Sequence, residues 1–311
     1  MLSADRKIAQ ESGIENRSPR ILHLAGPTGV GKTALAVALA ERLGAEIIGA
    51  DAFQIYADLP ILTAQPTAEQ MRRVPHHLVG SVPVAESFDA ARYAARAQSA
   101  IDAVLARGRT ALVAGGTGLY FRALIDGFAP APAADTALRD ELNAMELPAL
   151  VERLRAADAA APGQVDLRNK RRVTRAIEIV ETSGRPLCDF RATPRAEACG
   201  LLLVREREEM LRRIETNVRG MFDAGVVEEV RVLGGRIGPT AARAIGLREI
   251  QALIRGELTR AECEAAMIIS TRRYAKRQLT WFRRQTTFRA LDLTGIQNPA
   301  VEEALIALDL R

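Results

Sequence analysis

Residues 26–33 read Gly-Pro-Thr-Gly-Val-Gly-Lys-Thr, which is the complete phosphate-loop pattern G-x-x-x-x-G-K-[ST]. The apolar segment 21–25 before it has the composition of a short buried strand, and the alanine-rich segment 34–40 after it favours a helix. A strand, a glycine-rich turn and a helix start are the three parts that this motif requires. The stretch therefore predicts a phosphate-binding turn inside an α/β domain.

The predicted turn offers three kinds of ligand to a diphosphate or triphosphate. Its backbone N–H groups point inward to phosphate oxygens. Lys32 brings a positive charge to the outer phosphate, and the Thr33 hydroxyl is placed to hold a Mg²⁺ ion. A plain glycine-rich turn would leave this Lys-Thr pair at the helix start unexplained.

The composition is that of an ordinary globular protein. The 311 residues are 48% hydrophobic and 26% charged, and the net charge of +5 permits a polyanionic partner. Three widely spaced cysteines suit a reducing compartment. We expect no signal peptide and no membrane span, because the apolar segments that these need are missing. A cytoplasmic protein is therefore predicted.

Alternating strand and helix patterns follow the phosphate loop. Strands are predicted at 46–50 and 110–114, with a helix at 90–107 between them. This alternation favours a parallel sheet with helices on both faces, as in P-loop NTPases. In such sheets, ligands bind beyond the carboxyl ends of the strands. The phosphate loop, Asp51 and Thr117 all follow such ends, so we expect them to share one crevice.

The middle of the chain has a different character. Residues 128–132 resemble a linker, and three segments of helical apolar spacing follow before a glycine-proline stop at 183–186. An apolar segment at 200–204 then predicts a return to the sheet. We predict a flexible tail at 1–18, a core domain from 19–126 plus 187–311, and a small all-helical insertion domain at 127–186.

Three polar side chains near the predicted crevice could carry chemistry. Asp51 could act as a general base, although Asp is also common as a helix cap. Gln54 could pair with a nucleobase edge or complete a capping arrangement. The Thr117 hydroxyl could bond a leaving phosphate or an acceptor, or form a local turn. For the adjacent His76 and His77, which lack accompanying metal ligands, we predict a structural or capping role.

Basic residues gather in the segments 168–175, 243–248 and 271–289. The last of these contains seven Lys and Arg residues and no acidic residue, and it also carries Tyr274 and Trp281. A charged segment is usually a solvated face, but arginine beside aromatic rings suits phosphate contact and base stacking. We interpret these segments as nucleic-acid contacts, with the two aromatic residues more typical of core.

Seven sequence blocks, in their order and spacing, resemble the tRNA dimethylallyltransferase (isopentenyltransferase) family. The resemblance runs from residue 20 to residue 290, nearly the whole chain. The blocks are GPTGVGKT at 26–33, DAFQIY at 51–56, LTAQP at 62–66, VPHHL at 74–78, GGTGLY at 115–120, RRVTRAIE at 171–178 and YAKRQLTWFR at 274–283.

The resemblance implies the reaction. This family transfers a dimethylallyl group from dimethylallyl diphosphate to the exocyclic amine (N6) of the adenosine at position 37, beside the tRNA anticodon. By resemblance, Asp51 is the base, Thr117 contacts the reacting groups and Arg213 serves the diphosphate. Mg²⁺ is implied as cofactor, with Thr33 as its protein ligand. The implied diphosphate-binding residues are Gly26, Pro27, Thr28, Gly29, Val30, Gly31, Lys32 and Thr33.

The resemblance also implies contacts to the anticodon stem-loop of tRNA, from both the core and the helical insert. Gln54 would help to hold an adenine that has left its stack. We expect a monomer. The implied tRNA-binding residues are Asp51, Ala52, Phe53, Gln54, Thr117, Arg139, Arg171, Arg172, Arg175, Arg243 and Arg248.

The sequence departs from the family pattern at several positions. Ala52 stands where Ser commonly follows the catalytic Asp, Ala57 where a basic residue is usual, and Gln65 where Lys or Arg is usual. These changes bear on the catalytic rate more than on the fold.

A further departure concerns the diphosphate site. The family commonly carries two arginines four residues apart on a long helix; Arg213 is the first, but the second is Asn217. Loss of this cation weakens leaving-group stabilisation unless Arg219, Arg122 or another basic residue replaces it. Arg213 could also be only an i, i+4 partner of Glu209.

Three hypotheses follow. The first is an active tRNA prenyltransferase. The second is a small-molecule P-loop kinase, which would need an arginine-rich lid over ATP. The third, suggested by Asn217 and Ala52, is a catalytically weak tRNA-binding homologue, which would bind tRNA in a salt-dependent way.

Overall fold

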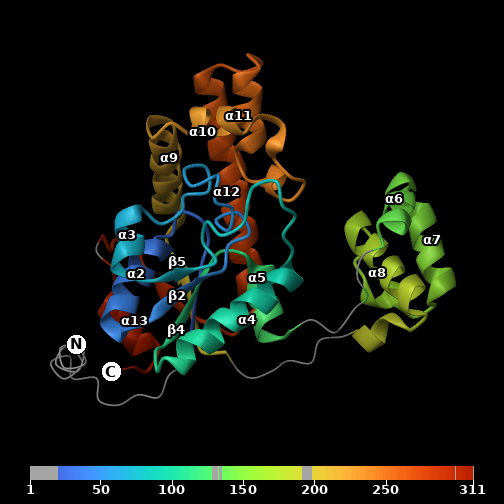
Figure 1. Ribbon diagram of the computed structural model, residues 1–311, viewed down its shortest axis with the longest axis horizontal. Helices are drawn as coiled ribbons and strands as arrows, with labels where there is room; N and C mark the ends of the chain where they lie inside the picture. The colour runs from blue at the N-terminus through green and yellow to red at the C-terminus, as the bar shows by residue number, and fades with distance from the viewer. Residues whose placement is uncertain (1–19, 128–131, 133–134, 191–197, 298, 311) are drawn as a thin grey trace. The chain divides into compact units, whose positions relative to one another are not determined.

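The computed structural model describes residues 20–127, 132, 135–190, 198–297 and 299–310 (Figure 1). The chain divides into two compact units, of which the first comprises the described parts of Met1–Leu124 and Glu197–Arg311, and the second those of Ile125–Ala196. The tail predicted at 1–18 and most of the predicted linker at 128–132 lie outside the described residues.

The first unit is built on a six-stranded sheet in the order β3-β2-β4-β1-β5-β6, and every pairing is parallel. The central strands are buried almost throughout, as expected for strands covered on both faces. This confirms the predicted α/β fold class. The strands are β1 (Ile21–Ala25), β2 (Glu46–Gly49), β3 (His76–His77), β4 (Ala111–Gly115), β5 (Gly200–Val204) and β6 (Arg289–Asp292).

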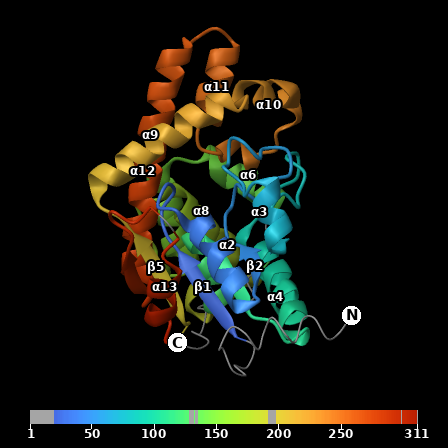
Figure 2. The same ribbon diagram turned by 90° about the vertical axis from the view of Figure 1, so that its left-hand side faces the viewer.

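Helices cover the sheet on both sides. In Figure 1, α2 and α13 lie to the left of the strands, and α4 and α5 lie to the right. Helices α9 to α12 pack on one another beyond the carboxyl ends of the strands (Figure 2). The helices of this unit are α2 (Lys32–Leu43), α3 (Ala68–Arg73), α4 (Ala90–Ala106), α5 (Gly118–Ile125), α9 (Arg207–Asp223), α10 (Val226–Leu233), α11 (Leu247–Ile254), α12 (Arg260–Gln285), α13 (Val301–Ala307) and the short 3₁₀ turns η3 (Gly234–Arg236) and η4 (Ala241–Arg243).

Helix α12 is the longest of the described helices and carries the acid-free basic segment. It starts with a capping box, in which the Thr259 side chain accepts from the backbone N–H of Glu262 and the Glu262 side chain accepts from that of Thr259. The buried residues Ala275, Gln278 and Phe282 fix one face of the helix against the sheet domain. Most basic residues of the segment within the helix are exposed, namely Arg273, Lys276, Arg277, Arg283 and Arg284, whereas Arg272 is partly buried and pairs with Glu215.

The second unit is all-helical. Its buried core contains Leu142, Leu150, Leu154, Val173 and Ile177. The helices are α6 (Thr136–Ala144), α7 (Leu147–Ala157) and α8 (Lys170–Ser183), with the short 3₁₀ turns η1 (Ala161–Gln164) and η2 (Leu187–Phe190).

The bounds of this second unit differ from the predicted 127–186. Helix α8 does end at Gly184, whose φ of 65° lies in the left-handed region that favours glycine. Leu187, however, packs against the helical core after the predicted stop, and the described part of this unit runs to Phe190. A glycine-proline signal ends a helix, but it does not show where the chain leaves that helix's hydrophobic core.

In the described ranges, no helix combines the length and the apolar composition that a membrane crossing requires.

Candidate active site

The phosphate loop connects β1 to α2, as its sequence predicts. Gly29 and Gly31 have φ values of 88° and 106°, which side chains rarely tolerate. A Cβ at Gly29 would also lie only 3.0 Å from Cγ1 of Ile214 on α9. The turn therefore needs glycine at these positions, both for its backbone shape and for the close approach of α9.

Lys32 and Thr33 begin α2 and line a small cavity of about 30 Å³ together with Gln54. The Lys32 Nζ donates a hydrogen bond to the carbonyl of Pro27 at 2.9 Å. Burial lowers the pKa of Lys32 to about 8, although the nearby Asp51 carboxylate favours its charged form. An anion in the loop would restore the stability of this charge.

The Thr33 hydroxyl fits the ligand chemistry of Mg²⁺. It has no hydrogen-bond partner among the described residues, and it is partly exposed to the cavity. Mg²⁺ takes oxygen ligands and usually keeps waters and phosphate oxygens in most positions. One hydroxyl beside a bound diphosphate is therefore a sufficient protein contribution.

Asp51 follows β2 and uses its two carboxylate oxygens differently. Oδ1 accepts backbone hydrogen bonds from Phe53 at 3.0 Å and from Gln54 at 3.4 Å. Oδ2 has no partner in the described part of the chain. Burial raises the pKa of Asp51, while these hydrogen bonds and the Lys32 charge oppose the rise. The capping role is therefore present on one oxygen, and the other is available as a base.

Thr117 lies at the carboxyl end of β4 and binds the segment that carries Asp51. Its hydroxyl oxygen accepts a hydrogen bond from the backbone N–H of Ala52 at 2.9 Å. Its own backbone N–H donates to the carbonyl of Ala50 at 3.1 Å. The Thr117 side chain thus connects its own loop to the loop that carries Asp51, and it does not form the local turn that the sequence offered as an alternative. The structure brings Lys32, Asp51 and Thr117 to one edge of the sheet.

Gln54 ties down the loop that follows Asp51. Its Nε2 donates to the carbonyls of Thr63 at 3.2 Å and Ala64 at 2.8 Å. Nε2 is therefore occupied, and Oε1 is the atom left to accept a hydrogen bond from a base. Beside it, the Phe53 ring lies 6.3 Å from that of Tyr274.

Gln278 is a site residue that the sequence reasoning did not single out. Its side chain is 5% exposed; Oε1 accepts from the backbone N–H of Thr28, and Nε2 donates to the carbonyl of Gly116, both at 2.9 Å. It therefore joins the phosphate loop to the loop that carries Thr117. Gln278 lies within the sequence block 274–283, which could have marked it as a site residue. Its partners Thr28 and Gly116 are too distant in the sequence to be inferred.

Arg213 on α9 contacts the phosphate loop directly. Its Nε donates to the carbonyl of Gly29 at 2.9 Å. Glu209, which the spacing offered as an i, i+4 partner, forms its ion pair with Arg205 instead. The position of Arg213 thus suits the diphosphate role that the resemblance implies.

The predicted tRNA contacts on the second unit fall into two groups. Arg139 and Arg175 both bind the carboxylate of Glu178, whose side chain is 1% exposed, at 2.7 Å and 3.0 Å. Burial favours the neutral acid, but these hydrogen bonds hold the pKa of Glu178 below its ordinary value. Arg171 and Arg172 are exposed, and Arg172 lies 3.7 Å from a carboxylate of Asp166.

On the first unit, Arg243 and Arg248 are exposed on η4 and α11. The guanidinium of Arg277 on α12 lies 5.7 Å from the centre of the Tyr274 ring. Tyr274 and Trp281 are partly buried, and Trp281 packs closely against Gly118. RNA contact by these residues stays a prediction.

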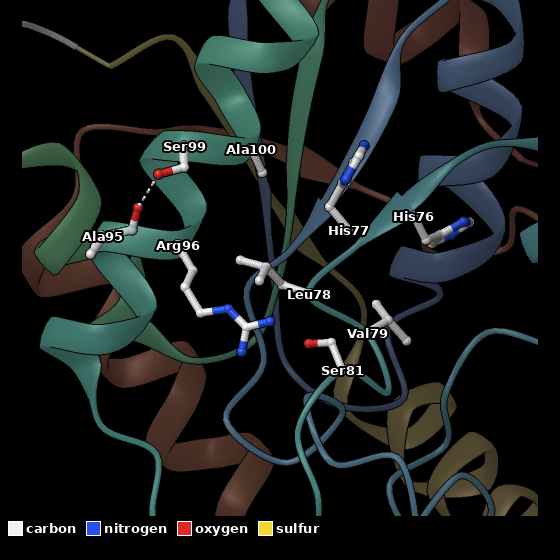
Figure 3. Close-up of a pocket in the computed structure, with 9 residues that line it drawn as sticks. All are labelled: His76, His77, Leu78, Val79, Ser81, Ala95, Arg96, Ser99 and Ala100. Atoms are coloured by element: carbon white, nitrogen blue, oxygen red, sulfur yellow. Dashed lines mark hydrogen bonds between the residues drawn. The ribbon is translucent and has the colours of Figure 1, made fainter.

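A separate pocket of about 560 Å³ lies between β3 and α4. Figure 3 shows the residues that line it, among them His77 and Arg96, and none of the predicted site residues is in this set. His77 Nε2 lies 2.7 Å from the buried carboxylate of Glu46, which also binds Arg107. In the described part of the chain, no cluster of three or more His, Cys, Asp or Glu residues could hold a metal. The structural role predicted for the histidine pair agrees with these contacts.

Comparisons with known proteins agree with this geometry. A family model described as IPP transferase matches residues 54–285. A tRNA dimethylallyltransferase of Akkermansia muciniphila is 40% identical over 282 residues, covering 89% of this chain and 95% of that protein. The tRNA dimethylallyltransferase of Anaeromyxobacter dehalogenans strain 2CP-C is 45% identical over 276 residues, covering 86% and 92%.

Two solved structures are similar as well. The full-length tRNA isopentenylpyrophosphate transferase of Bacillus halodurans has a TM-score of 0.69 and 34% identity, with 94% of this chain and 96% of that chain covered. A eukaryotic dimethylallyltransferase acting on tRNA has a TM-score of 0.79 and 24% identity, covering 93% and 78%, and supports the fold alone. This chain therefore belongs to the IPP transferase family, the family of the tRNA dimethylallyltransferases that its sequence blocks resemble.

Proposed function

We propose that this protein transfers a dimethylallyl group from dimethylallyl diphosphate to N6 of the adenosine at position 37 of tRNA and releases diphosphate. The observation that carries the proposal is the meeting of the phosphate loop, Asp51 and Thr117 at one edge of the sheet, in a chain of the IPP transferase family. A diphosphate site next to an unpartnered carboxylate oxygen is what such a transfer requires.

The phosphate loop stabilises the leaving group. As the bond between the allylic carbon and the diphosphate oxygen breaks, negative charge grows on that oxygen. The loop N–H groups, the Lys32 ammonium and the Arg213 guanidinium are fixed around this position and need no reorganisation. The Thr33 hydroxyl would hold Mg²⁺, which would supply further neutralisation of the diphosphate when bound.

Asp51 takes the proton of the attacking amine. The bond from N6 to the allylic carbon forms while N6 loses a proton to Oδ2 of Asp51. The raised pKa makes this carboxylate a stronger base than an exposed one, and the two backbone hydrogen bonds to Oδ1 fix its direction. Because the exocyclic amine of adenine is a weak nucleophile, this fixed geometry carries much of the effect.

Thr117 and Gln54 position the reacting groups. The oxygen of Thr117 accepts from Ala52, and its hydroxyl also lies within hydrogen-bond reach of Tyr274, so its proton can be donated to the Tyr274 oxygen or to the substrate. Gln54 lines the same cavity as Lys32 and Thr33, and its Oε1 could accept a hydrogen bond from the N–H donors of an adenine that has left its stack. The exposed Arg171, Arg172 and Arg248 are suited to contacts with the RNA phosphates. We expect the protein to act in the cytoplasm, since the substrate is tRNA, and to be a monomer.

A single-turnover assay tests the proposal. Purified protein, Mg²⁺ and dimethylallyl diphosphate are mixed with unmodified tRNA that carries adenosine at position 37, and the digested nucleosides are weighed. We expect one adenosine heavier by a dimethylallyl group, absent without Mg²⁺ and absent in tRNA with guanosine at position 37. Bound but unmodified tRNA would favour the weakly active homologue, and ATP-dependent phosphorylation of a metabolite would favour the kinase.

A further inference from the structure

Arg205 lies at the carboxyl end of β5, directly beside the phosphate loop. Its side chain is 3% exposed, and its Nε donates to the carbonyl of Val30 within the loop at 3.3 Å. Nη1 and Nη2 both reach the carbonyl of Ile296 at 3.3 Å, and Nη1 forms the ion pair with Glu209. These contacts fix the guanidinium in place. It can still donate one more hydrogen bond, because only one of the two N–H groups of Nη2 is needed for the contact with Ile296.

Two guanidinium groups converge on the same part of the loop. A Cβ built at Gly31 would lie 3.5 Å from Nη2 of Arg213 and 3.8 Å from Nη2 of Arg205. Gly31 itself has no side chain, so both nitrogens lie beside the backbone of the turn at this position. Both side chains are also bonded to the turn through Nε, Arg213 to the carbonyl of Gly29 and Arg205 to the carbonyl of Val30.

This convergence of like charges is unfavourable without a ligand. Burial and the repulsion from Arg205 lower the pKa of Arg213, and Glu209 offsets only part of this effect. The buried ammonium of Lys32 adds a third cation to the loop. Repulsion and desolvation make it energetically unfavourable to hold these cations together. An anion with several negative charges would offset this unfavourable free energy. A diphosphate is such an anion.

The guanidinium of Arg205 matters because Asn217 has taken the place of an arginine that the family pattern has. Asn217 is exposed on α9, one turn beyond Arg213, where the family resemblance leads to an arginine. Arg219 is a poor substitute, because six residues along a helix place it on another face from Arg213. Arg122 lies on α5, which Figure 1 shows to the right of the strands, whereas α9 lies at the upper left. Arg205 reaches the loop from β5 instead.

We propose that Arg205 is the second cation of the diphosphate site and does the work of the arginine that Asn217 replaces. The inference rests on the proposed function, since it assumes that the loop binds a diphosphate. In this protein the second positive charge would come from Arg205 at the end of β5, whereas the family pattern places it on the long helix, at the position of Asn217.

Binding of inorganic diphosphate with Mg²⁺, measured by titration calorimetry, tests this role without catalysis. For Arg205→Gln we expect at least about tenfold weaker binding, the effect of losing one charge-assisted contact. Arg205→Lys keeps the charge but loses the bonds to Val30 and Ile296, and we expect it to stay within about threefold of wild type. Arg207→Gln, an exposed arginine two residues away, is the matched control and should bind normally.

Two results would overturn the proposal. One is an Arg205→Gln variant that binds diphosphate as the wild type does. The other is an Arg205→Lys variant as weak as Arg205→Gln, because a purely structural anchor loses its bonds in both. If the wild type itself does not bind diphosphate, the proposed function fails as well, so the two failures are distinguishable.

Asn217→Arg in the otherwise wild-type protein covers the case in which the Arg205 variants fold poorly, and the same change in Arg205→Gln is a rescue experiment. Asn217→Arg should restore diphosphate binding to Arg205→Gln by about tenfold, yet change the wild type less than twofold. If Asn217→Arg alone tightens binding of the wild type by about tenfold, the site lacks a second cation and the proposal is wrong.

Discussion

Gln278 accepts a hydrogen bond from the backbone N–H of Thr28 at 2.9 Å, across 250 residues of sequence. Its amide nitrogen donates to the carbonyl of Gly116 at the same distance. One buried side chain therefore sets the spacing between the loop proposed to hold the diphosphate and the loop that carries Thr117. Gln278 lies on α12, the helix that also carries the acid-free basic segment.

Replacing Gln278 should separate these two loops. For Gln278→Ala we expect a KM for dimethylallyl diphosphate raised about tenfold and a free energy of unfolding lowered by about 1–3 kcal/mol, because two buried backbone groups lose their partner. Steady-state kinetics and thermal unfolding measure both effects. Gln285→Ala, at the exposed end of the same helix, is the control. An unchanged KM would show that the two loops hold their spacing without Gln278.

Asp51→Asn should remove the base and keep the loop. The amide oxygen can still accept from Phe53 and Gln54, so folding and diphosphate binding should be normal. The single-turnover rate should fall by about 10² to 10⁴, the usual contribution of a general base. Rapid-quench measurement of prenylated tRNA gives the rate. A variant with the full rate would remove Asp51 from the mechanism.

The pH dependence of kcat/KM for dimethylallyl diphosphate should be bell-shaped. The raised pKa of Asp51 means that the rate climbs as this carboxyl loses its proton, at a higher pH than for an exposed Asp. Lys32 has a pKa lowered to about 8, so the free enzyme loses this cation, and with it diphosphate affinity, above about pH 8. Bound diphosphate raises the pKa of Lys32 again.

The alkaline fall should therefore appear in kcat/KM and not in kcat, since kcat reports the bound state. The same fall should appear in calorimetric titrations of diphosphate between pH 7 and pH 9. Affinity that stays constant across this range would contradict the lowered pKa of Lys32.

The arginines of the second unit should separate into structural and RNA-binding residues. Arg139→Ala should lower the free energy of unfolding by about 2 kcal/mol, because it takes a charged partner from the buried Glu178. Arg171→Ala, at an exposed position, should leave stability unchanged. It should weaken tRNA binding and reduce the slope of log affinity against log salt by about 0.7–0.9. Equal tRNA affinity of wild type and Arg171→Ala would exclude this contact.

Strong local patterns predicted much of the fold. The apolar runs before the phosphate loop and at 200–204 form β1 and β5, and the helical spacing around Val173 and Ile177 forms α8. The strands β3 and β6 were not predicted. β3 has only two residues and most of β6 is exposed, so neither leaves an apolar run in the sequence.

The site residues could be predicted where they are adjacent in the sequence or directly follow a predicted strand. The phosphate loop could be recognised from eight adjacent residues, and Asp51 and Thr117 from their positions after strands. The sequence left the capping and base roles of Asp51 as alternatives. The tertiary structure shows that the two oxygens can serve both, since only Oδ1 accepts the backbone hydrogen bonds.

By itself, the sequence determined the α/β class, the phosphate turn and the presence of a helical insert, because each depends on residues close together in the chain. Only the tertiary structure decided that Gln278 joins the two site loops, that Arg205 reaches the phosphate turn and that Arg139 binds Glu178. These contacts depend on side chains that the folded backbone brings together across long stretches of sequence, and no local periodicity encodes which partner each will meet.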